Sequence, residues 1–390
     1  MPQVALLLET STEYGRGLLR GIVRYSRLHG PWSLYVAPGH LEQALPKAKS
    51  WSGSGIIGRI RSPEMAKLIR GTRVPFVASS LDESRASAHG DKFGEIRTHS
   101  AAIGWMAAEH LVDRGLRHFA FCGFVGCAWS SRREEVFSQY LLDLGFKCQT
   151  HRIELANWMQ QPGWIENWED EQPILMRWLK SLPKPVGLMA CNDACGREVL
   201  QACAAAGLRV PDDVAVVGVD NDELMCELSS PPLSSVALDL GKAGYEAARL
   251  LGNLMSGQLT GGHVVHVEPV YVVARQSTEA IVQDDADIAS ALRFIRNHAA
   301  QPIGVPDVVE HLGVSRRTLE REFSRALDRS IAAEITQSRL ERAKRLLLET
   351  DMPPHRVAVG AGFGSVKTFY RVFRRAAGVP PKYFRQNPGA

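Results

Sequence analysis

Short apolar runs alternate with helical patterns over about the first 277 residues of the chain. Runs of buried-strand character lie at 4–8, 33–37, 55–57, 75–79, 118–122, 186–190, 214–219 and 234–238. Segments with apolar residues at helical spacing lie between them, at 17–28, 101–113, 133–144, 171–182, 194–206 and 242–255. A repeating strand–helix order predicts parallel sheets covered on both faces. Because the stretch is longer than one sheet usually needs, we expect an α/β domain of two similar lobes.

Beyond this stretch the apolar residues recur mainly at helical spacing. One segment there occurs twice, fifty residues apart. The copies at 315–326 and 365–376 share Ser, Thr, Arg, Phe, Arg and Ala in register. In each copy the serine can cap a helix whose apolar stripe follows at helical spacing. A short helix and a turn ending at Gly313 precede the first copy. This pattern predicts an all-α domain with two helix-turn-helix units.

An uninterrupted helical stretch at 331–349 separates the two copies. Its 19 residues would span about 28 Å as a helix. Successive major grooves on one side of DNA lie about 34 Å apart. The stretch is therefore suited to hold two recognition helices for two neighbouring grooves. The alternative is a plain helical bundle with a polar surface.

The charge distribution supports a division of the chain. We assign 1–277 to the α/β domain, 278–286 to a linker and 287–388 to the helical domain. From Asp287 to Ala390 there are 18 Lys and Arg against 10 Asp and Glu, whereas the remainder has 28 against 32. A basic domain on a mildly acidic body indicates a polyanionic partner for the basic part.

The cysteines and the N-terminus restrict the class of protein. Seven cysteines lie between Cys122 and Cys226, an odd number without metal-ligand spacing. They predict buried thiols in a reducing compartment. No secretory signal pattern is present, and no run approaches the ~18 apolar residues of a membrane helix. We expect a cytoplasmic protein with no cofactor, no metal and no membrane partner.

Polar and aromatic residues follow several predicted strands. Open parallel sheets bind ligands at the carboxyl ends of their strands. The candidates there are Tyr14, Arg16, Trp129, Arg133, Asn192, Asp193, Asp220 and Asn221. Carboxylate, amide and guanidinium groups can pair with neighbouring hydroxyls, and a ring can cover the C–H face of a sugar. As alternatives, Asp193 and Asp220 could cap helices, and Tyr14 and Trp129 could be packing residues.

One stretch carries a family resemblance. Residues 191–197, the run 206–221 with Val-Pro-Asp-Asp-Val-Ala-Val-Val-Gly, and 233–236 resemble the LacI/GalR-type, periplasmic-binding-protein-like effector domain. The resemblance covers about residues 3–277 and implies sugar contacts by Arg133, Asp193 and Asp220. That family carries its DNA-binding domain ahead of the first strand. Here the first strand starts near residue 4, so DNA binding would have to come from elsewhere.

The helical domain resembles the AraC/XylS-type DNA-binding domain over about residues 288–386. The resemblance rests on 342–347, 357–358, 362–365, Phe369, Phe373-Arg374, 378–381 and Tyr383 to Arg385. By position it implies base reading by Arg317, Glu320 and Arg321 in the first unit. In the second unit it implies base reading by Val366, Lys367, Tyr370 and Arg371, and we add Arg316 to the DNA-binding set. The family often has a polar residue in place of Val366. An apolar residue there suggests contact with a thymine methyl or weaker readout, so we expect the first unit to carry more of the base specificity.

This domain order resembles the regulators of xylose operons. Their effector pocket uses a Tyr-x-Arg pair after the first strand, matched here by Tyr14 and Arg16. The resemblance implies a D-xylose-activated transcription factor that forms a homodimer through its N-terminal domain, 1–277, and binds an operator, with RNA polymerase as a further partner. The alternatives are a sugar-responsive repressor, or a sugar-binding or sugar-processing protein with a helical tail. We expect no enzyme, because no Gly-rich phosphate loop, metal cluster or nucleophile motif accompanies the carboxylates.

Overall fold

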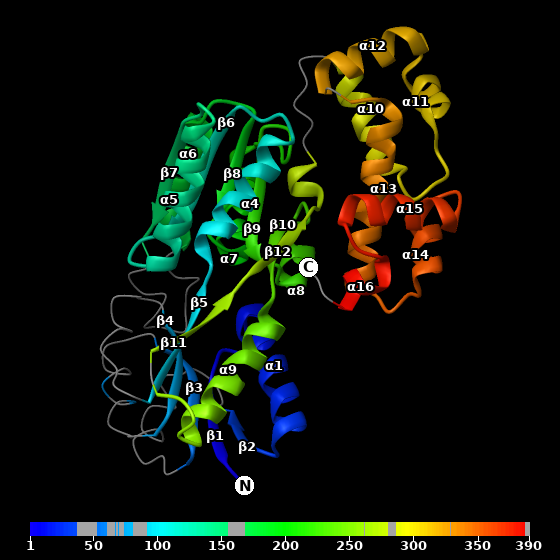
Figure 1. Ribbon diagram of the computed structural model, residues 1–390. Helices are drawn as coiled ribbons and strands as arrows, with labels where there is room; N and C mark the ends of the chain where they lie inside the picture. The colour runs from blue at the N-terminus through cyan, green and yellow to red at the C-terminus, as the bar shows by residue number, and fades with distance from the viewer. Residues whose placement is uncertain are drawn as a thin grey trace. The chain divides into compact units, whose positions relative to one another are not determined.

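The computed structural model describes residues 1–36, 53–60, 67, 69, 74–80, 92–154, 168–260, 262–279, 286–327 and 329–386. The chain divides into two compact units, Met1–Thr278 and Glu279–Ala390 (Figure 1). Most of the predicted linker at 278–286 lies outside the described residues. Within the described ranges no helix has the length and apolarity needed to cross a membrane.

The first unit contains two six-stranded sheets, one in each lobe. The first sheet has the order β11-β5-β4-β3-β1-β2, and its pairings are all parallel. Its strands are β1 (Gln3–Leu7), β2 (Ser33–Val36), β3 (Gly55–Ile60), β4 (Phe76–Ser80), β5 (Phe93–Thr98) and β11 (His263–Val267). Residues from β1 and β3 are buried toward both faces of this sheet, as expected of a parallel sheet covered by helices.

The second sheet has the order β12-β10-β9-β8-β6-β7, and only its edge strand β12 runs antiparallel, against β10. Its strands are β6 (His118–Phe124), β7 (Cys148–Ile153), β8 (Val186–Ala190), β9 (Val214–Asp220), β10 (Ser234–Leu238) and β12 (Pro269–Val273). The two-lobed α/β architecture was predicted and is confirmed. Four strands, β5, β7, β11 and β12, were not predicted. Polar residues interrupt the apolar pattern of the first three, and β12 begins with a proline.

Helices cover both sheets of the first unit. They are α1 (Glu13–His29), α4 (Ser100–Val112), α5 (Ala128–Asp143), α6 (Trp168–Ser181), α7 (Asp193–Ala206), α8 (Glu223–Leu228) and α9 (Leu240–Met255), with a 3₁₀ turn η2 (Gln276–Thr278). α1 and α9 pack together and share a core with the first sheet, which includes Leu6, Leu18, Ile22 and Leu251. α4, α5 and α7 pack on the second sheet. Six of the seven cysteines are buried, as predicted, and Cys148 is half-buried.

The chain passes between the two lobes after β5, after β10 and between β11 and β12. Backbone hydrogen bonds tie these crossings together: His99 N–H donates to Val267 O over 3.0 Å, and Asp239 N–H donates to Glu268 O over 2.9 Å. The His99 ring Nδ1 lies 2.7 Å from a Glu268 carboxylate oxygen. The two lobes are therefore joined by three adjacent segments, and each lobe is assembled from separate stretches of sequence.

The second unit is helical throughout its described part. Its helices are α10 (Ala286–Asn297), α11 (Val305–Leu312), α12 (Arg316–Leu327), α13 (Ile331–Glu349), α14 (Pro354–Gly360), α15 (Val366–Ala377) and α16 (Pro381–Gln386). The 19-residue helix α13 has the predicted bounds. Its first half contributes to one hydrophobic core with α10–α12, and its second half contributes to another with α14–α16. Two helix-turn-helix units thus share one long helix.

The repeated segment forms the same structure twice. The Ser315 hydroxyl accepts from the Thr318 N–H, and the Ser365 hydroxyl accepts from the Thr368 N–H, each over 3.2 Å. These serine caps begin α12 and α15, as predicted. Leu319 and Phe323 in α12, like Phe369 and Phe373 in α15, are fully buried.

The turn between α14 and α15 contacts the turn that follows α10. Gly362 has a φ of +81°, and a Cβ built on it would lie 2.0 Å from the carbonyl oxygen of Ala299. Only glycine combines this left-handed backbone with so close an approach. The position therefore fixes how the second helix-turn-helix unit packs against the first.

Candidate functional site

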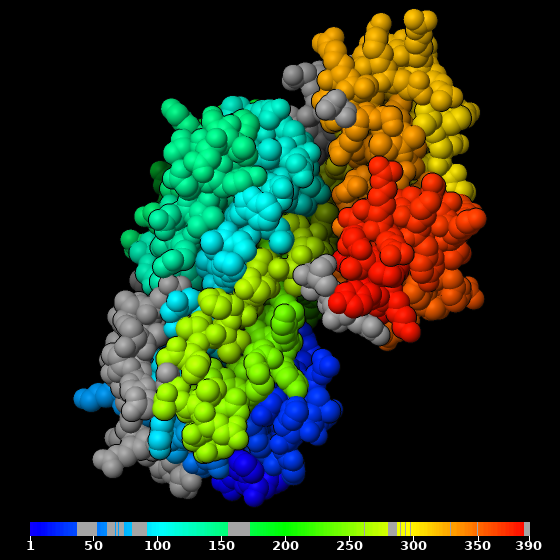
Figure 2. Space-filling view, in the orientation of Figure 1, coloured from blue at the N-terminus to red at the C-terminus, as the bar shows by residue number. Residues whose placement is uncertain are grey.

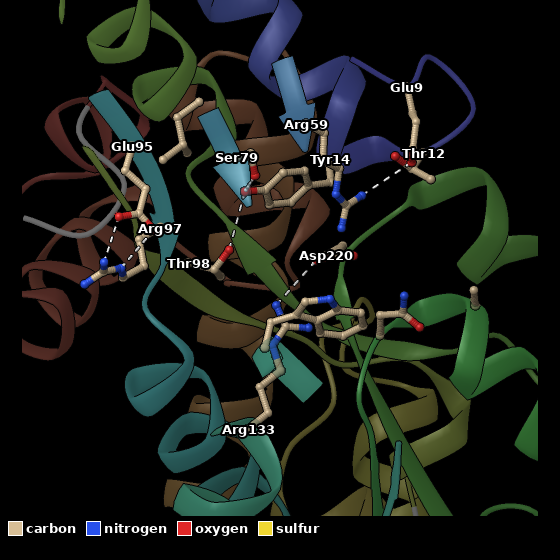
Figure 3. Close-up of a pocket in the computed structure, with 14 residues that line it drawn as sticks. Glu9, Thr12, Tyr14, Arg59, Ser79, Glu95, Arg97, Thr98, Arg133 and Asp220 are labelled. Atoms are coloured by element: carbon tan, nitrogen blue, oxygen red, sulfur yellow. Dashed lines mark hydrogen bonds and ion pairs between the residues drawn. The ribbon is translucent and has the colours of Figure 1, made fainter. Parts of the chain in front are cut away.

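A polar cleft lies between the two lobes of the first unit (Figure 3). Its lining comes from both lobes: Glu9, Thr12, Tyr14, Arg59, Ser79, Glu95, Ile96, Arg97 and Thr98 from the first lobe, and Trp129, Arg133, Asn192, Ala194 and Asp220 from the second. These residues follow or end strands at the carboxyl edges of the two sheets, which is where open parallel sheets bind ligands. The structure therefore brings five predicted residues together at one cleft: Tyr14, Trp129, Arg133, Asn192 and Asp220.

The wall from the first lobe is built around Tyr14. Its ring belongs to the core under α1, and its hydroxyl lies 3.1 Å from the Ser79 hydroxyl and 3.4 Å from that of Thr98. The Arg59 guanidinium lies over the same ring, 5.3 Å from its centre, and 3.4 Å from a Glu9 carboxylate oxygen. Tyr14 is thus both a packing residue of the core and a lining residue of the cleft.

The wall from the second lobe is built around Arg133, whose side chain is only 3% exposed. It donates to the carbonyl oxygen of Cys191, and its guanidinium lies over the Trp129 ring, 5.0 Å from the centre. It also lies 4.0 Å from the Asp220 carboxylate (Figure 3). Among the described residues, Trp129 Nε1 and Asp220 Oδ1 are buried without a hydrogen-bond partner. Buried polar groups usually have partners, so these atoms are suited to receive a polar ligand.

The backbone holds Asp220 in an unusual conformation. Asp220 and Asn221 have φ values of +103° and +50°, and non-glycine residues with positive φ concentrate at functional sites. The Asn221 N–H donates to the Ser235 hydroxyl over 3.0 Å. Burial raises the pKa of Asp220 to about 6, although the Arg133 guanidinium acts in the opposite direction.

Asn192 and Asp193 have different roles in the structure. The Asn192 side chain caps α7 by accepting from the Cys195 N–H over 2.9 Å, and it also lines the cleft. The Asp193 side chain is buried; it accepts from the Ser235 hydroxyl and from the Asp222 N–H. Burial, with the nearby Asp220, raises the pKa of Asp193 well above its usual range. Asp193 therefore supports the cleft wall from behind, and neither it nor Asn221 is among the lining residues.

Arg16 lies at a contact between the lobes instead of lining the cleft. Its guanidinium lies 2.8 Å from the Asp222 carboxylate and donates to the Thr10 carbonyl. The same Asp222 oxygen accepts from the Glu13 N–H over 2.9 Å. Asp222 also caps α8, so the start of α1 in the first lobe is tied to the start of α8 in the second.

The sequence interpretation missed several lining residues. Glu95, Arg97 and Thr98 lie on or at the end of β5, which was not predicted as a strand. Arg97 forms an ion pair with Glu95 at 2.7 Å. Arg59 and Ser79 lie at the ends of β3 and β4, where the same strand-end argument could have found them.

If the cleft binds a sugar, the affinity should depend on pH through Asp220. If its carboxylate accepts from a sugar hydroxyl, binding requires the charged form. Above the pKa of about 6 the affinity should be constant, and as pH falls below it the affinity should decrease toward tenfold per pH unit. Calorimetry from pH 5 to 8 would measure this, with proton release on binding near pH 5. Asp220→Asn should bind weakly and independently of pH; a wild-type affinity that is flat over this range would contradict the assignment.

The second unit presents the predicted DNA-binding residues on its surface. Arg316, Arg317, Glu320 and Arg321 are exposed on α12. Three of them take part in surface ion pairs, Arg316 with Glu320 at 2.9 Å and Arg321 with Glu322 at 3.5 Å. Because such exposed pairs contribute little stability, these side chains can exchange their partners for DNA at low cost.

The corresponding surface of α15 is partly apolar. Val366 and Tyr370 are 39% and 40% exposed, and Lys367 and Arg371 are exposed beside them. The adjoining stripe of the helix carries the buried Phe369 and Phe373. α15 therefore has one apolar face for the core and one mixed face suited to the floor and edges of a major groove.

Comparison with known proteins gives two matching family models. A periplasmic binding protein-like domain matches residues 108–278, and a helix-turn-helix domain matches residues 308–387. The chain is 32% identical to the xylose operon regulatory protein of Haemophilus influenzae over 389 residues, which cover 99% of this chain and 98% of that protein. It is 31% identical to the protein of the same name from Escherichia coli (strain K12), over 98% of this chain and 96% of the other.

A solved structure agrees with these relatives. The structure of the xylose-binding transcription activator xylR covers 99% of this chain and 98% of its own, with a TM-score of 0.63 and 30% identity. The similarity extends over both units and includes their order along the sequence. The predicted resemblance is thereby confirmed, and the chain belongs to the family of xylose operon regulatory proteins.

Proposed function

We propose that this protein is a transcription regulator that binds D-xylose in the cleft between its lobes and an operator through its two helix-turn-helix units. The observation that carries the proposal is the second-lobe wall of the cleft. There Arg133 and Asp220 lie beside an indole, and Trp129 Nε1 and Asp220 Oδ1 lack hydrogen-bond partners within the described structure. The names of the relatives, and the xylose-binding activator with a similar structure, support the choice of sugar and the activating sign.

Each cleft residue has a proposed role. Arg133 and Asn192 donate to sugar oxygens, Asp220 accepts from sugar hydroxyls, and Trp129 covers the C–H face of the ring. Tyr14 closes the cleft from the first lobe. Asp193, Asn221 and Arg16 act as positioning residues that hold the strand end and the lobe contact in place.

The sugar would act by stabilising one arrangement of the lobes. A ligand that contacts both walls binds the closed arrangement better than the open one, and it shifts the equilibrium only by that difference in affinity. We propose that the protein works in the cytoplasm as a homodimer. The closed arrangement would then set the positions of the two DNA-binding units on the operator and relative to RNA polymerase.

Calorimetry with xylose, arabinose, ribose and glucose tests the sugar assignment. We expect xylose to bind most tightly, and we expect no product when the protein is incubated with any of the four. Flat traces with all four sugars would remove the pentose assignment. Conversion of a pentose by the purified protein would replace the binding function with an enzymatic one.

Replacing Arg321 by alanine tests the first recognition helix. We expect a loss of about 1–3 kcal/mol at the operator and relaxed base preference at one position. Arg325, an exposed arginine of the same helix outside the proposed base-reading set, provides the control. Arg325→Ala should keep the base preference. Binding competition over a set of single-base operator variants would measure both proteins, and an unchanged preference in Arg321→Ala would contradict the role.

A further inference from the structure

Four arginines recur along one side of α1. Arg16, Arg20, Arg24 and Arg27 are separated by four, four and three residues, a spacing that puts them on one helix face. From the first to the last the helix rises about 16 Å. The last three are exposed to solvent, because the opposite face of α1 packs on α9 and the first sheet.

Acidic residues neutralise only the beginning of this stripe. Arg20 forms an ion pair with Glu13. Arg24 lies over the ring of Tyr245 on α9, 5.9 Å from the ring centre. Neither Arg24 nor Arg27 has an acidic partner in the described parts of the chain. The C-terminal half of α1 therefore presents uncompensated positive charge.

α9 extends the same surface. Lys242 and Arg249 are exposed on it, and Arg249 is paired with Glu246. Figure 2 shows the blue surface of the N-terminal residues adjoining the yellow-green surface that contains α9. We name Arg20, Arg24, Arg27, Lys242 and Arg249 together the α1–α9 basic face.

The composition of this face favours a polyanion over a protein partner. Stable protein interfaces have an apolar, aromatic-rich centre, whereas Leu28 is the one large apolar residue of α1 with high exposure. Arginine forks match phosphate oxygens in pairs. The remainder of the chain outside the basic domain is acidic, with 28 basic against 32 acidic residues, so DNA would be repelled from the body except at such a face.

We propose that the α1–α9 basic face binds the phosphate backbone of DNA that flanks the operator, without reading its sequence. The inference rests on the proposed function, because the helix-turn-helix units bring DNA to the chain. Once they are bound, the flanking duplex is present at high effective concentration, so a few arginine contacts suffice for a second, weak attachment. The attachment would fix the orientation of the sugar-binding unit on the DNA.

The test compares two duplexes with the full-length protein. One covers the operator alone, and the other adds about 30 base pairs, roughly three helical turns, on each side. Binding is measured over a series of salt concentrations. Each phosphate contact contributes about 0.9 to the slope of log affinity against log salt. We expect Arg24→Gln/Arg27→Gln to reduce the magnitude of this slope by about 1–2 on the long duplex. The slope on the short duplex should stay unchanged.

A charge-matched variant in the second lobe is the control. Lys147 and Lys180 are both exposed there, and Lys147→Gln/Lys180→Gln removes the same charge. It should leave both slopes unchanged. An unchanged long-duplex slope in Arg24→Gln/Arg27→Gln would overturn the proposal. An equal reduction of the slope on both duplexes, or an equal reduction in the control variant, would overturn it as well. Failure of the wild-type protein to prefer the operator over scrambled short DNA would instead overturn the proposed function.

Discussion

Replacing Arg133 by alanine should weaken sugar binding by at least about thirtyfold, which corresponds to 2 kcal/mol or more for truncating one member of a buried charged pair. In the proposed site, the variant removes the guanidinium that would donate to the sugar. It also removes the stronger of the two guanidinium effects that lower the pKa of Asp220, those of Arg133 and Arg59, which should raise that pKa further above about 6 and favour the neutral acid. Calorimetric titration with xylose would give the loss directly.

The neighbouring Arg132 provides the matched control. It belongs to the same helix but is exposed to solvent, so Arg132→Ala should bind the sugar within about twofold of wild type, the range expected for a change away from the site. The sugar affinity of Arg133→Lys should lie between those of Arg133→Ala and Arg132→Ala, because lysine keeps the charge but loses the planar fork. Circular dichroism would establish that each variant is folded. Wild-type affinity in a folded Arg133→Ala protein would exclude Arg133 from the site.

Replacing Gly362 by alanine should destabilise the helical unit by about 2–4 kcal/mol. Part of the cost, about 1 kcal/mol, is the left-handed backbone at φ +81°, which an L-residue tolerates poorly. The rest, about 1–3 kcal/mol, comes from forcing the new methyl group away from the Ala299 carbonyl oxygen. Urea denaturation of the full chain would measure the change, and binding to the operator should weaken as the second unit is displaced.

Gly378 separates the two contributions. It has a similar φ of +72°, yet nothing lies within 4 Å of a Cβ built on it. Gly378→Ala should therefore show the backbone cost of about 1 kcal/mol alone. If the free energy of unfolding falls equally in the two variants, the close approach of Gly362 to the Ala299 carbonyl adds nothing to the cost of the substitution.

The helical unit was predictable because its signals are local. The serine at 315 and the serine at 365 cap the helices that follow them, and residues four apart such as Leu319 and Phe323 face the core. Cap and stripe both operate within two turns of helix, so sequence spacing translates directly into geometry. Which exposed residues read bases depends on the DNA, and those assignments stay predictions.

The cleft was predictable only in outline. The strand-end rule led to Arg133 and Asp220, but it could not distinguish a lining residue from one behind the wall. Asp193 was considered as a helix cap or a sugar ligand, yet Asn192 is the cap and the Asp193 carboxylate accepts from Ser235. Arg16 pairs with Glu13 nearby and also with Asp222, which is far away in the sequence. Contacts of this kind arise from tertiary packing, which no local pattern encodes.

The order of segments in the first unit has a consequence for synthesis on the ribosome. The sheet of the first lobe holds β1 to β5, but it gains the neighbouring β11 only when residues 263–267 have been made, and the α9 partner of α1 comes just before. The side of α1 that packs on α9, and the apolar face of β3–β5 that α9 covers, with Val77 and Ile96, therefore stay uncovered while the whole second lobe is translated. At about 5–20 residues per second this lasts on the order of ten seconds. The nascent first lobe should thus be a substrate for chaperones, whereas the contiguous helical unit can fold as soon as it emerges.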